Sequence, residues 1–349
     1  MKILIKQARI IDPSSPHNGQ ITNIFIENGL ISQIGNNLNP EADQVISLDG
    51  LCVSPGWVDV FANFADPGYE YKETLETGAA AAAAGGYTDV LIIPNTNPVL
   101  HNKAAVEYVV HKGQHLPVTI HPIGAITRNT EGKELAEMYD MKWSGAAAFS
   151  DGINCVQSAG LLVKALQYVK AFDGVIIQVP DDKSVNPPGL INEGIVSTQL
   201  GLPGKPAMAE ELVVERDISL AEYTGSKLHL TGISTRKSAE YIRKGKESGI
   251  PVSCSVTPYH LYLSDEEVPL RIVLGALQKF GDDERSEHNG RLPHRFGEFR
   301  LCRSGSCSER ADPNRSINHD HDRRPLLLYN RNRRQPARAI PGGCTHGPL

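Results

Sequence analysis

Long apolar runs and paired cysteines are missing from this sequence. No apolar segment approaches the roughly 18 residues that a membrane-spanning helix needs. The six cysteines form no Cys-x-x-Cys pair, which argues against a zinc ribbon or a disulfide framework. Residues 1–6 lack the basic start and the long apolar centre of a signal peptide. These absences argue against membrane and disulfide-rich classes, so we expect a cytoplasmic protein with no membrane partner.

Lysine is nearly absent from the last part of the chain. Residues 1–270 contain 15 lysines, 5 arginines and 31 acidic residues, a net charge of −11. Residues 271–349 contain 1 lysine, 14 arginines and 9 acidic residues, a net charge of +6. Three interpretations stay open for this tail: a nucleic-acid-binding arm, a disordered segment, and the product of a reading-frame error near residue 266. Because the arginine runs at 323–324 and 331–334 contain no aromatic residue, we expect no nucleic-acid partner.

The remainder has the composition of a soluble globular protein, with 40% hydrophobic and 21% charged residues overall. Residues 1–53 alternate polar and apolar side chains in short segments, and Asn28-Gly29 is a hairpin signal. On pattern alone this could be any small β-module, but the segment also resembles the small β-sandwich that flanks the barrel in amidohydrolases. The expected strands are 3–9, 23–27, 30–34 and 44–48.

From residue 54 the pattern changes to alternating strands and helices, which predicts an α/β fold of the (β/α)8 barrel type over residues 54–265. No eighth strand is found after residue 270, so the barrel is expected to be incomplete at its C-terminal end. Residues 266–349 form a third, aperiodic segment. The seven expected barrel strands are 57–61, 89–93, 118–121, 146–149, 175–178, 227–231 and 252–256.

Residues 54–68, SPGWVDVFANFADPG, resemble the first barrel strand of the class I dihydroorotases, cyclic amidohydrolases of pyrimidine synthesis. That family has Pro-Gly, two apolar residues, then Asp-x-His-x-His-x-Arg-x-Pro-Gly at this place. Further matches follow in order and at family spacing, so the resemblance covers roughly residues 1–265. They lie at residues 70–89, 94–98, 122–127, 189–194, 200–204, 209–211 and 257–261.

The resemblance also shows what this chain has lost in that first strand. Phe61 and Asn63 stand where the family has two metal-binding histidines, and Ala65 stands where it has an arginine. Two histidines in a His-x-His pair would share one face of a strand. Phe61 has no lone pair to offer, and the neutral amide of Asn63 is a poor zinc ligand.

The same loss recurs at the later strands. The resemblance places histidines where this chain has Gln178 and Gly232, and an aspartate on an eighth strand that has no counterpart here. Asp151 is the one family metal position that this chain retains. A lone carboxylate does not hold a pair of zinc ions. Asp151 also precedes Gly152 and is well suited to a turn, so a purely structural role is the competing interpretation.

Asn95 lies in the Pro94–Pro98 loop, which contacts substrate in the family, and is our candidate substrate-binding residue. Capping a turn is the alternative role for this side chain. Three histidines near strand ends, His121, His229 and His260, could form an alternative site together with Asp151, which we call the rewired site. A solitary histidine near a core is more often a hydrogen-bonded packing residue. His319–Asp322 mimics a His-x-His pair, but it lies in the aperiodic tail.

The favoured hypothesis is therefore a non-catalytic dihydroorotase-like protein with no catalytic residue and no bound cofactor, although zinc serves the active family. The resemblance implies a structural partnership with aspartate carbamoyltransferase, within an oligomer. Two alternatives stay open. One is an active zinc-dependent cyclic amidohydrolase that converts dihydroorotate to N-carbamoyl-aspartate through a reduced site. The other is a defective, truncated gene product.

Overall fold

The computed structural model describes residues 1–185, 187–267 and 327–329. Contacts divide the chain into two units, Met1–Asp265 with Pro325–Leu349, and Glu266–Arg324. All but the first two residues of the second unit fall outside the described part of the chain. The expected lack of an eighth strand after residue 270 concerns residues that lie almost entirely outside the described part of the chain, as do the His319–Asp322 segment and nearly all of the tail to which the reading-frame hypothesis applies.

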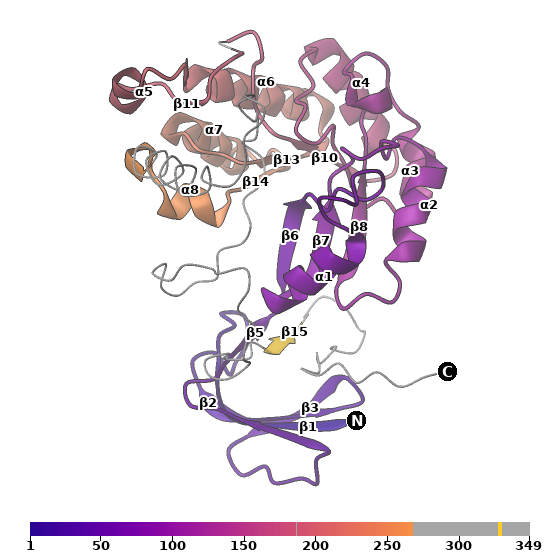
Figure 1. Cartoon of the computed structure of the whole chain (residues 1–349), viewed down its shortest axis with the longest axis vertical. Helices are drawn as coiled ribbons and strands as arrows, with labels where there is room; N and C mark the ends of the chain where they lie inside the picture. The colour runs from indigo at the N-terminus through magenta and orange to yellow at the C-terminus, as the bar shows by residue number, and fades with distance from the viewer. Residues whose placement is uncertain (186, 268–326, 330–349) are drawn as a thin grey trace, which may run out of the picture. The chain divides into compact units, whose positions relative to one another are not determined.

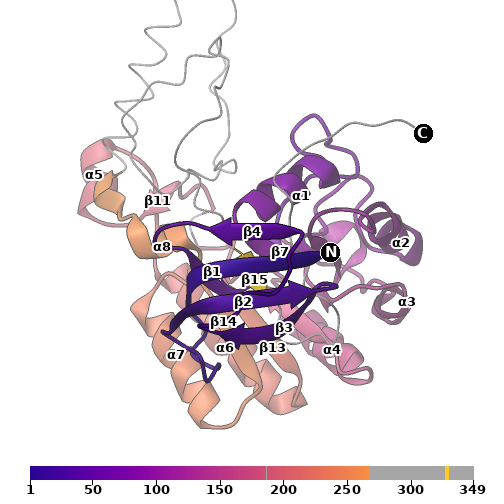
Figure 2. The same ribbon diagram turned by 90° about the horizontal axis from the view of Figure 1, so that it is seen from below.

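The N-terminal strands form one mixed sheet (Figure 2). Its central strand β1 (Lys2–Ile10) is antiparallel to β2 (Ile21–Glu27) and parallel to β4 and β5. Alternate side chains of β1 and β2 share a buried apolar face, which explains the period-two pattern of the sequence. The other strands are β3 (Leu30–Gly35), β4 (Gln44–Ser47), β5 (Cys52–Pro55) and β15 (Leu327–Tyr329).

Seven parallel strands form a second, curled sheet in the order β14-β13-β10-β9-β8-β7-β6, and all seven expected barrel strands are present in it (Figure 1). The barrel-type α/β fold is therefore confirmed for the described residues. The strands are β6 (Trp57–Ala62), β7 (Tyr87–Ile92), β8 (Thr119–Gly124), β9 (Ala148–Phe149), β10 (Val175–Gln178), β13 (Lys227–Thr231) and β14 (Val252–Ser255).

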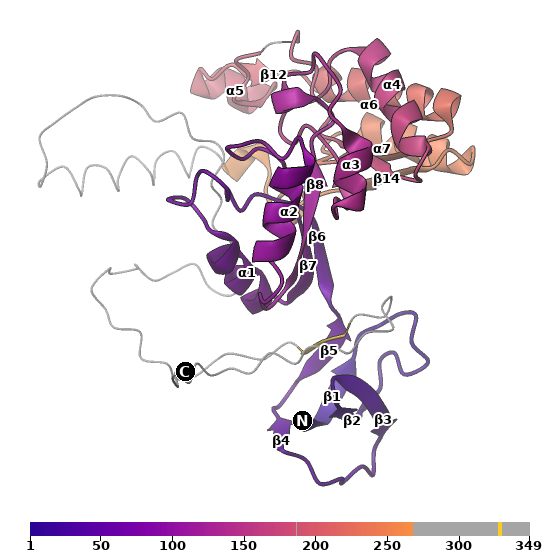
Figure 3. The same cartoon turned by 90° about the vertical axis from the view of Figure 1, so that its right-hand side faces the viewer.

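Helices connect these strands and pack on the outer face of the sheet; Figure 3 shows α1 and α2 beside β7 and β8. Side-chain caps define several helix starts, as Thr74 does for α1 and Asn102 for α2. The helices are α1 (Leu75–Ala84), α2 (Lys103–Lys112), α3 (Met138–Trp143), α4 (Ala159–Lys170), α5 (Ile195–Leu200), α6 (Met208–Thr224), α7 (Arg236–Glu247) and α8 (Pro258–Tyr262), with 3-10 turns at Arg128–Thr130 and Asp265–Glu267.

A long insertion separates β10 from α6 and contains the short strand pair β11 (Ile191–Asn192) and β12 (Gly204–Lys205). The sequence pattern alone did not predict this pair or the short helices α3, α5 and α8, because two to six residues carry too little periodicity. In the described part of the chain, every helix is too short or too polar to cross a bilayer.

Two apolar layers hold the barrel sheet together. The outer layer lies between the strands and helices such as α4, α6 and α7, and includes Leu166, Val214 and Ile242. The inner layer lies on the concave face of the sheet and includes Ile93, Ile123 and Ile177 from three different strands. Parallel strands buried on both faces have continuous apolar runs, as in residues 90–93 and 175–177. The carboxyl ends of the strands therefore meet at one edge, where sites form in this class of fold.

Candidate functional site

The first strand of the barrel ends without a metal-binding side chain. Phe61 on β6 is half-buried and packs against the inner layer formed by Ile93, Ile123 and Ile177. Asn63, just beyond the strand, is exposed, and its Oδ1 accepts a hydrogen bond from the Ala65 N–H at 3.1 Å. Asn63 therefore closes a local turn. Ala65 is buried and has a φ of 59°.

Asp151, after β9, is 1% exposed, and its carboxylate is surrounded by protein donors. Oδ1 accepts from the N–H groups of Ile126 at 2.9 Å and Thr127 at 2.8 Å, and Oδ2 accepts from the Thr127 hydroxyl at 2.5 Å. Burial raises the pKa of Asp151 to about 6, although the hydrogen bonds from Thr127 and Ile126 favour the charged form. The carboxylate thus joins the loops that follow β8 and β9.

Asn95, after β7, bonds to the same loop with both ends of its amide. Nδ2 donates to the Asp151 carbonyl at 3.2 Å, and Oδ1 accepts from the Ile153 N–H at 3.1 Å. Gly152 permits this approach, since it has a φ of 64° and an added Cβ would lie 1.6 Å from the Asn95 Oδ1. The structure therefore brings the two predicted site residues, Asn95 and Asp151, together at one loop. A substrate contact for Asn95 stays a prediction.

Gln178, at the end of β10, is 1% exposed and replaces a histidine of the family pattern. Its Oε1 accepts from the Val156 N–H at 3.3 Å. Its Nε2 has no hydrogen-bond partner within the described residues. Gly232, beyond β13, has a φ of 74° and open space where a side chain would begin.

The three candidate histidines do not gather around Asp151. His121 Nε2 lies 2.8 Å from Asp89 Oδ1 on the neighbouring strand. His229 Nδ1 and Nε2 lie 2.8 Å and 2.9 Å from the hydroxyls of Ser253 and Ser255, and burial lowers its pKa.

His260 Nδ1 lies 2.8 Å from the Thr257 hydroxyl at the start of α8. Across residues 1–185 and 187–267, no three His, Cys, Asp or Glu side chains are placed to share a metal ion. The rewired site is therefore not supported by these residues.

Arg216 on α6 also holds the loop after β9. The sequence pattern did not reveal this contact. Its guanidinium donates to the carbonyls of Gln157 at 2.7 Å and Val156 at 2.8 Å, and to Asp217 Oδ1 at 2.8 Å. Burial raises the pKa of Asp217 to about 6, although Arg216 opposes this effect. An Arg-Asp pair inside a helix has no sequence signature that distinguishes it from an exposed ion pair.

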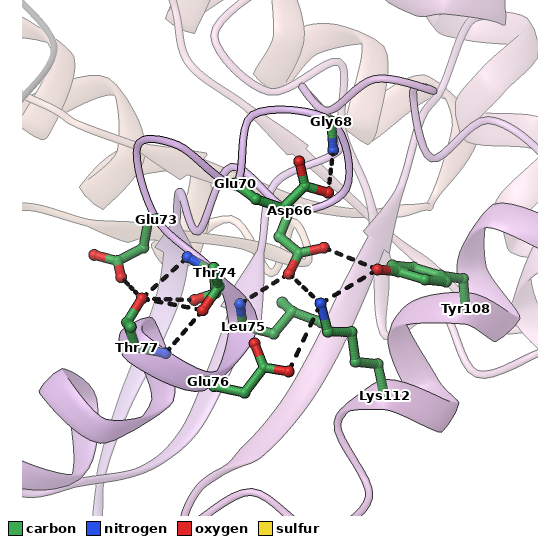
Figure 4. A network of polar contacts seen from close by, with 10 residues as sticks. All are labelled: Asp66, Gly68, Glu70, Glu73, Thr74, Leu75, Glu76, Thr77, Tyr108 and Lys112. Atoms are coloured by element: carbon green, nitrogen blue, oxygen red, sulfur yellow. Dashed lines mark hydrogen bonds and ion pairs between the residues drawn. The ribbon is translucent and has the colours of Figure 1, made fainter.

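A third polar group anchors the loop after β6 (Figure 4). Asp66 is fully buried, and its Oδ2 accepts from Lys112 Nζ at 2.7 Å and from the Leu75 N–H at 3.0 Å. Its Oδ1 accepts from the Tyr108 hydroxyl at 3.1 Å. Burial lowers the pKa of Lys112, but the hydrogen bond and charge of Asp66 outweigh this and raise it overall. Asp66 thus ties the first strand's loop to α1 and α2.

The donors at the strand ends do not fit a zinc pair. Phe61 offers carbon only, Gly232 has no side chain, and the Gln178 oxygen is already engaged by a backbone N–H. Both oxygens of Asp151 accept hydrogen bonds from protein donors. Zinc sites need three or four imidazole, thiolate or carboxylate ligands. At the ligand positions that the resemblance implies, the described residues supply one carboxylate, Asp151, and a metal would have to displace its hydrogen bonds.

Solved structures share the fold of this chain. An L-hydantoinase (dihydropyrimidinase) from Arthrobacter aurescens superimposes with a TM-score of 0.64 at 21% identity, over 76% of this chain and 60% of that one. A dihydropyrimidinase from Brevibacillus agri NCHU1002 gives a TM-score of 0.61 at 17% identity, over 77% and 60% of the two chains. These likenesses show a shared barrel-type fold.

Sequence comparison then gives the family. The dihydro-orotase-like family model matches residues 50–238, and this chain belongs to that family. The dihydroorotase of Pelotomaculum thermopropionicum is 44% identical over 270 residues, covering 77% of this chain and 62% of that protein. The dihydroorotase of Syntrophus aciditrophicus is 41% identical over 271 residues, covering 77% and 63%. This chain thus spans a little over three fifths of the length of these curated relatives.

Proposed function

We propose that this chain is a dihydroorotase-like protein of pyrimidine biosynthesis that does not hydrolyse dihydroorotate and acts as a structural partner of aspartate carbamoyltransferase. The observation that carries the proposal is the replacement of the ligands at the strand ends. Phe61 packs against the inner apolar layer, and both carboxylate oxygens of Asp151 accept hydrogen bonds, one from the Ile126 N–H and the other from the Thr127 hydroxyl. A cytoplasmic, oligomeric setting belongs to the same proposal.

The chemical argument starts from the reaction. Ring opening of a cyclic amide at neutral pH needs a strong nucleophile, and the metal of the active family would supply it by lowering the pKa of a bound water. Zinc is the metal expected of this type of amidohydrolase. Near the strand ends of this chain, Asn95, Asp151 and Gln178 instead hold loops together, since all three side chains bond to backbone groups. Retained shape with absent ligands supports a role in assembly.

An active cyclic amidohydrolase is the second candidate. It is favoured by relatives named dihydroorotase at 40–44% identity, and by the proximity of Asn95 and Asp151 at one strand edge. On this hypothesis Asn95 would bind substrate and Asp151 would be a residual metal ligand. Both hypotheses share the fold and differ in metal content and turnover.

Three measurements on the purified full chain separate the two hypotheses. We expect zinc well below one equivalent by elemental analysis, no dihydroorotate turnover above background, and co-purification with co-expressed aspartate carbamoyltransferase. The proposal fails if tightly bound zinc is stoichiometric and turnover is lost on Asp151→Ala. Absence of any complex with the transferase removes the partner role and leaves the catalytic question to the first two assays.

A matched gain-of-ligand variant controls for the metal assay. The quadruple change Phe61→His, Asn63→His, Gln178→His and Gly232→His restores the family histidines around Asp151. Because an imidazole is a good zinc ligand, this variant is expected to retain more zinc than the parent chain after dialysis. Equal zinc content in the two proteins would show that these positions do not govern metal binding.

A further inference from the structure

A large polar pocket lies beside the strand ends, between the insertion and two helices. Its volume is about 770 Å³, within the usual range for small-molecule sites. Pro180 and Asp181 after β10 form one wall, the β11 and β12 segments form another, and the first turns of α6 and α7 complete it. Neither the family match nor the resemblance assigns a ligand to this pocket.

Four of the eight charged side chains that line this pocket form two ion pairs. Asp181 pairs with Lys205 at 2.6 Å, and Glu211 pairs with Lys237 at 3.4 Å. Glu210 accepts hydrogen bonds from the backbone and hydroxyl groups of Ser234 and Thr235 at the start of α7. These contacts build the walls, and they leave those groups with little capacity for a ligand charge.

Three charged side chains of the lining stay unpaired. Arg236, Glu193 and Glu240 line the pocket, are exposed, and have no ion pair with another described residue. Arg236 and Glu240 belong to the first two turns of α7, whereas Glu193 comes from the insertion on the other side. The pocket therefore offers one cationic group and two anionic groups from two different walls.

We propose that this pocket binds a free basic α-amino acid such as arginine. A basic amino acid carries one carboxylate and two cationic groups, which is the complement of the three unpaired side chains. Its carboxylate would pair with the guanidinium of Arg236, because these two planar groups can form two parallel hydrogen bonds. Its α-ammonium group and its side-chain cation would form ion pairs with Glu193 and Glu240. This inference does not rest on the proposed function, because it uses none of the strand-end residues.

Isothermal titration calorimetry of the full chain with L-arginine tests the site. We expect saturable binding that weakens with added salt, since the contacts are charged and partly solvated. Arg236→Gln, Glu193→Gln and Glu240→Gln should each weaken binding about threefold to tenfold. Arg243→Gln and Glu247→Gln are matched controls on α7, because both residues are exposed and lie outside the pocket.

Three analogues test each contact separately. Agmatine lacks the carboxylate, Nα-acetyl-L-arginine lacks the α-ammonium, and L-citrulline lacks the side-chain charge, so each should bind more weakly than L-arginine. The proposal is overturned if L-arginine shows no saturable heat at millimolar concentration. It is equally overturned if the three lining variants bind as the parent chain does, or if citrulline or agmatine matches arginine.

Discussion

Two buried carboxylates in this barrel have opposite surroundings. Asp66 is fully buried, and one of its oxygens is paired with Lys112 at 2.7 Å. Asp151 is 1% exposed, and its partners are neutral N–H and O–H groups of Ile126 and Thr127. The first carboxylate is compensated by a protein cation, whereas the second gains hydrogen bonds without a countercharge.

This difference shows what the chain has preserved. The region around Asp66 fixes the loop after β6 to α1 and α2, and it has kept a buried ion pair with its hydrogen-bonding partners (Figure 4). Asp151 stands at the position that the resemblance assigns to a metal ligand, and its carboxylate oxygens accept hydrogen bonds from the protein's own neutral donors. Asp66 and Asp151 are therefore expected to respond differently to mutation and to pH.

Removing Asp66 should have the largest effect. Asp66→Ala leaves Lys112, Tyr108 and the Leu75 N–H without their buried acceptor, so we expect a loss of about 3 kcal/mol in the free energy of unfolding. Denaturant titration followed by circular dichroism measures it. The control is Glu76→Ala, since Glu76 is 53% exposed and lies 3.7 Å from Lys112. That change should cost less than about 0.5 kcal/mol; equal losses would refute a special role for Asp66.

Restoring a single family histidine should destabilise the chain. Phe61→His places a polar ring against the apolar inner layer of Ile93, Ile123 and Ile177 with no metal ligands beside it. We expect a loss of about 2 kcal/mol in unfolding free energy. Asn63→His, at an exposed position, is the matched control and should change stability little. A neutral or stabilising Phe61→His would mean that the strand end still accommodates a ligand.

The pH dependence of stability should reveal Asp151. Its pKa is raised to about 6 in the folded chain, above the unfolded value of about 4, so the folded state binds the proton more tightly. The resulting stabilisation is present at low pH and is lost as the pH rises through about 6. Relative to Asp151→Asn, the parent chain should therefore gain about 1 to 2 kcal/mol between pH 7.5 and 4.5.

Thermal melts of both proteins at the two pH values measure this difference. Asp182→Asn is the control with the opposite sign, because hydrogen bonds from Ser184 lower the pKa of Asp182. For that pair the contribution of the carboxylate should stay nearly constant from pH 7.5 to 4.5 and diminish only on acidification below about pH 4, which a third melt at lower pH measures. An Asp151 pair with the same sign as the Asp182 pair would contradict the assigned effect of burial.

The sequence could predict the strands and the fold, because alternation of apolar segments with helices extends over about two hundred residues. It could also place Asn95 and Asp151 at the same edge, since the carboxyl ends of parallel strands meet there. It could not predict that both side chains would bond to backbone groups. That outcome depends on the loop conformation at Gly152, where the φ is 64°.

Pairings between distant residues were also beyond the sequence pattern. Asp66 meets Lys112 from 46 residues away, and Arg216 meets the Val156 carbonyl from 60 residues away. Neither pair lies at a helical or strand spacing, so each arises only when the barrel brings the strands and helices together. The same limit applies to Gln178, whose substitution was evident but whose bond to the Val156 N–H was not.

Both backbone polar groups of Val156 are hydrogen-bonded, its N–H to Gln178 of β10 and its carbonyl to Arg216 of α6. Strand and helix are thereby connected through a third segment, without passing through the insertion that lies between them in the chain. We therefore expect a change in the length of that insertion to leave these two contacts of Val156 in place. The insertion is therefore a segment in which substitutions can alter the surface of the protein while the contacts between β10 and α6 are kept.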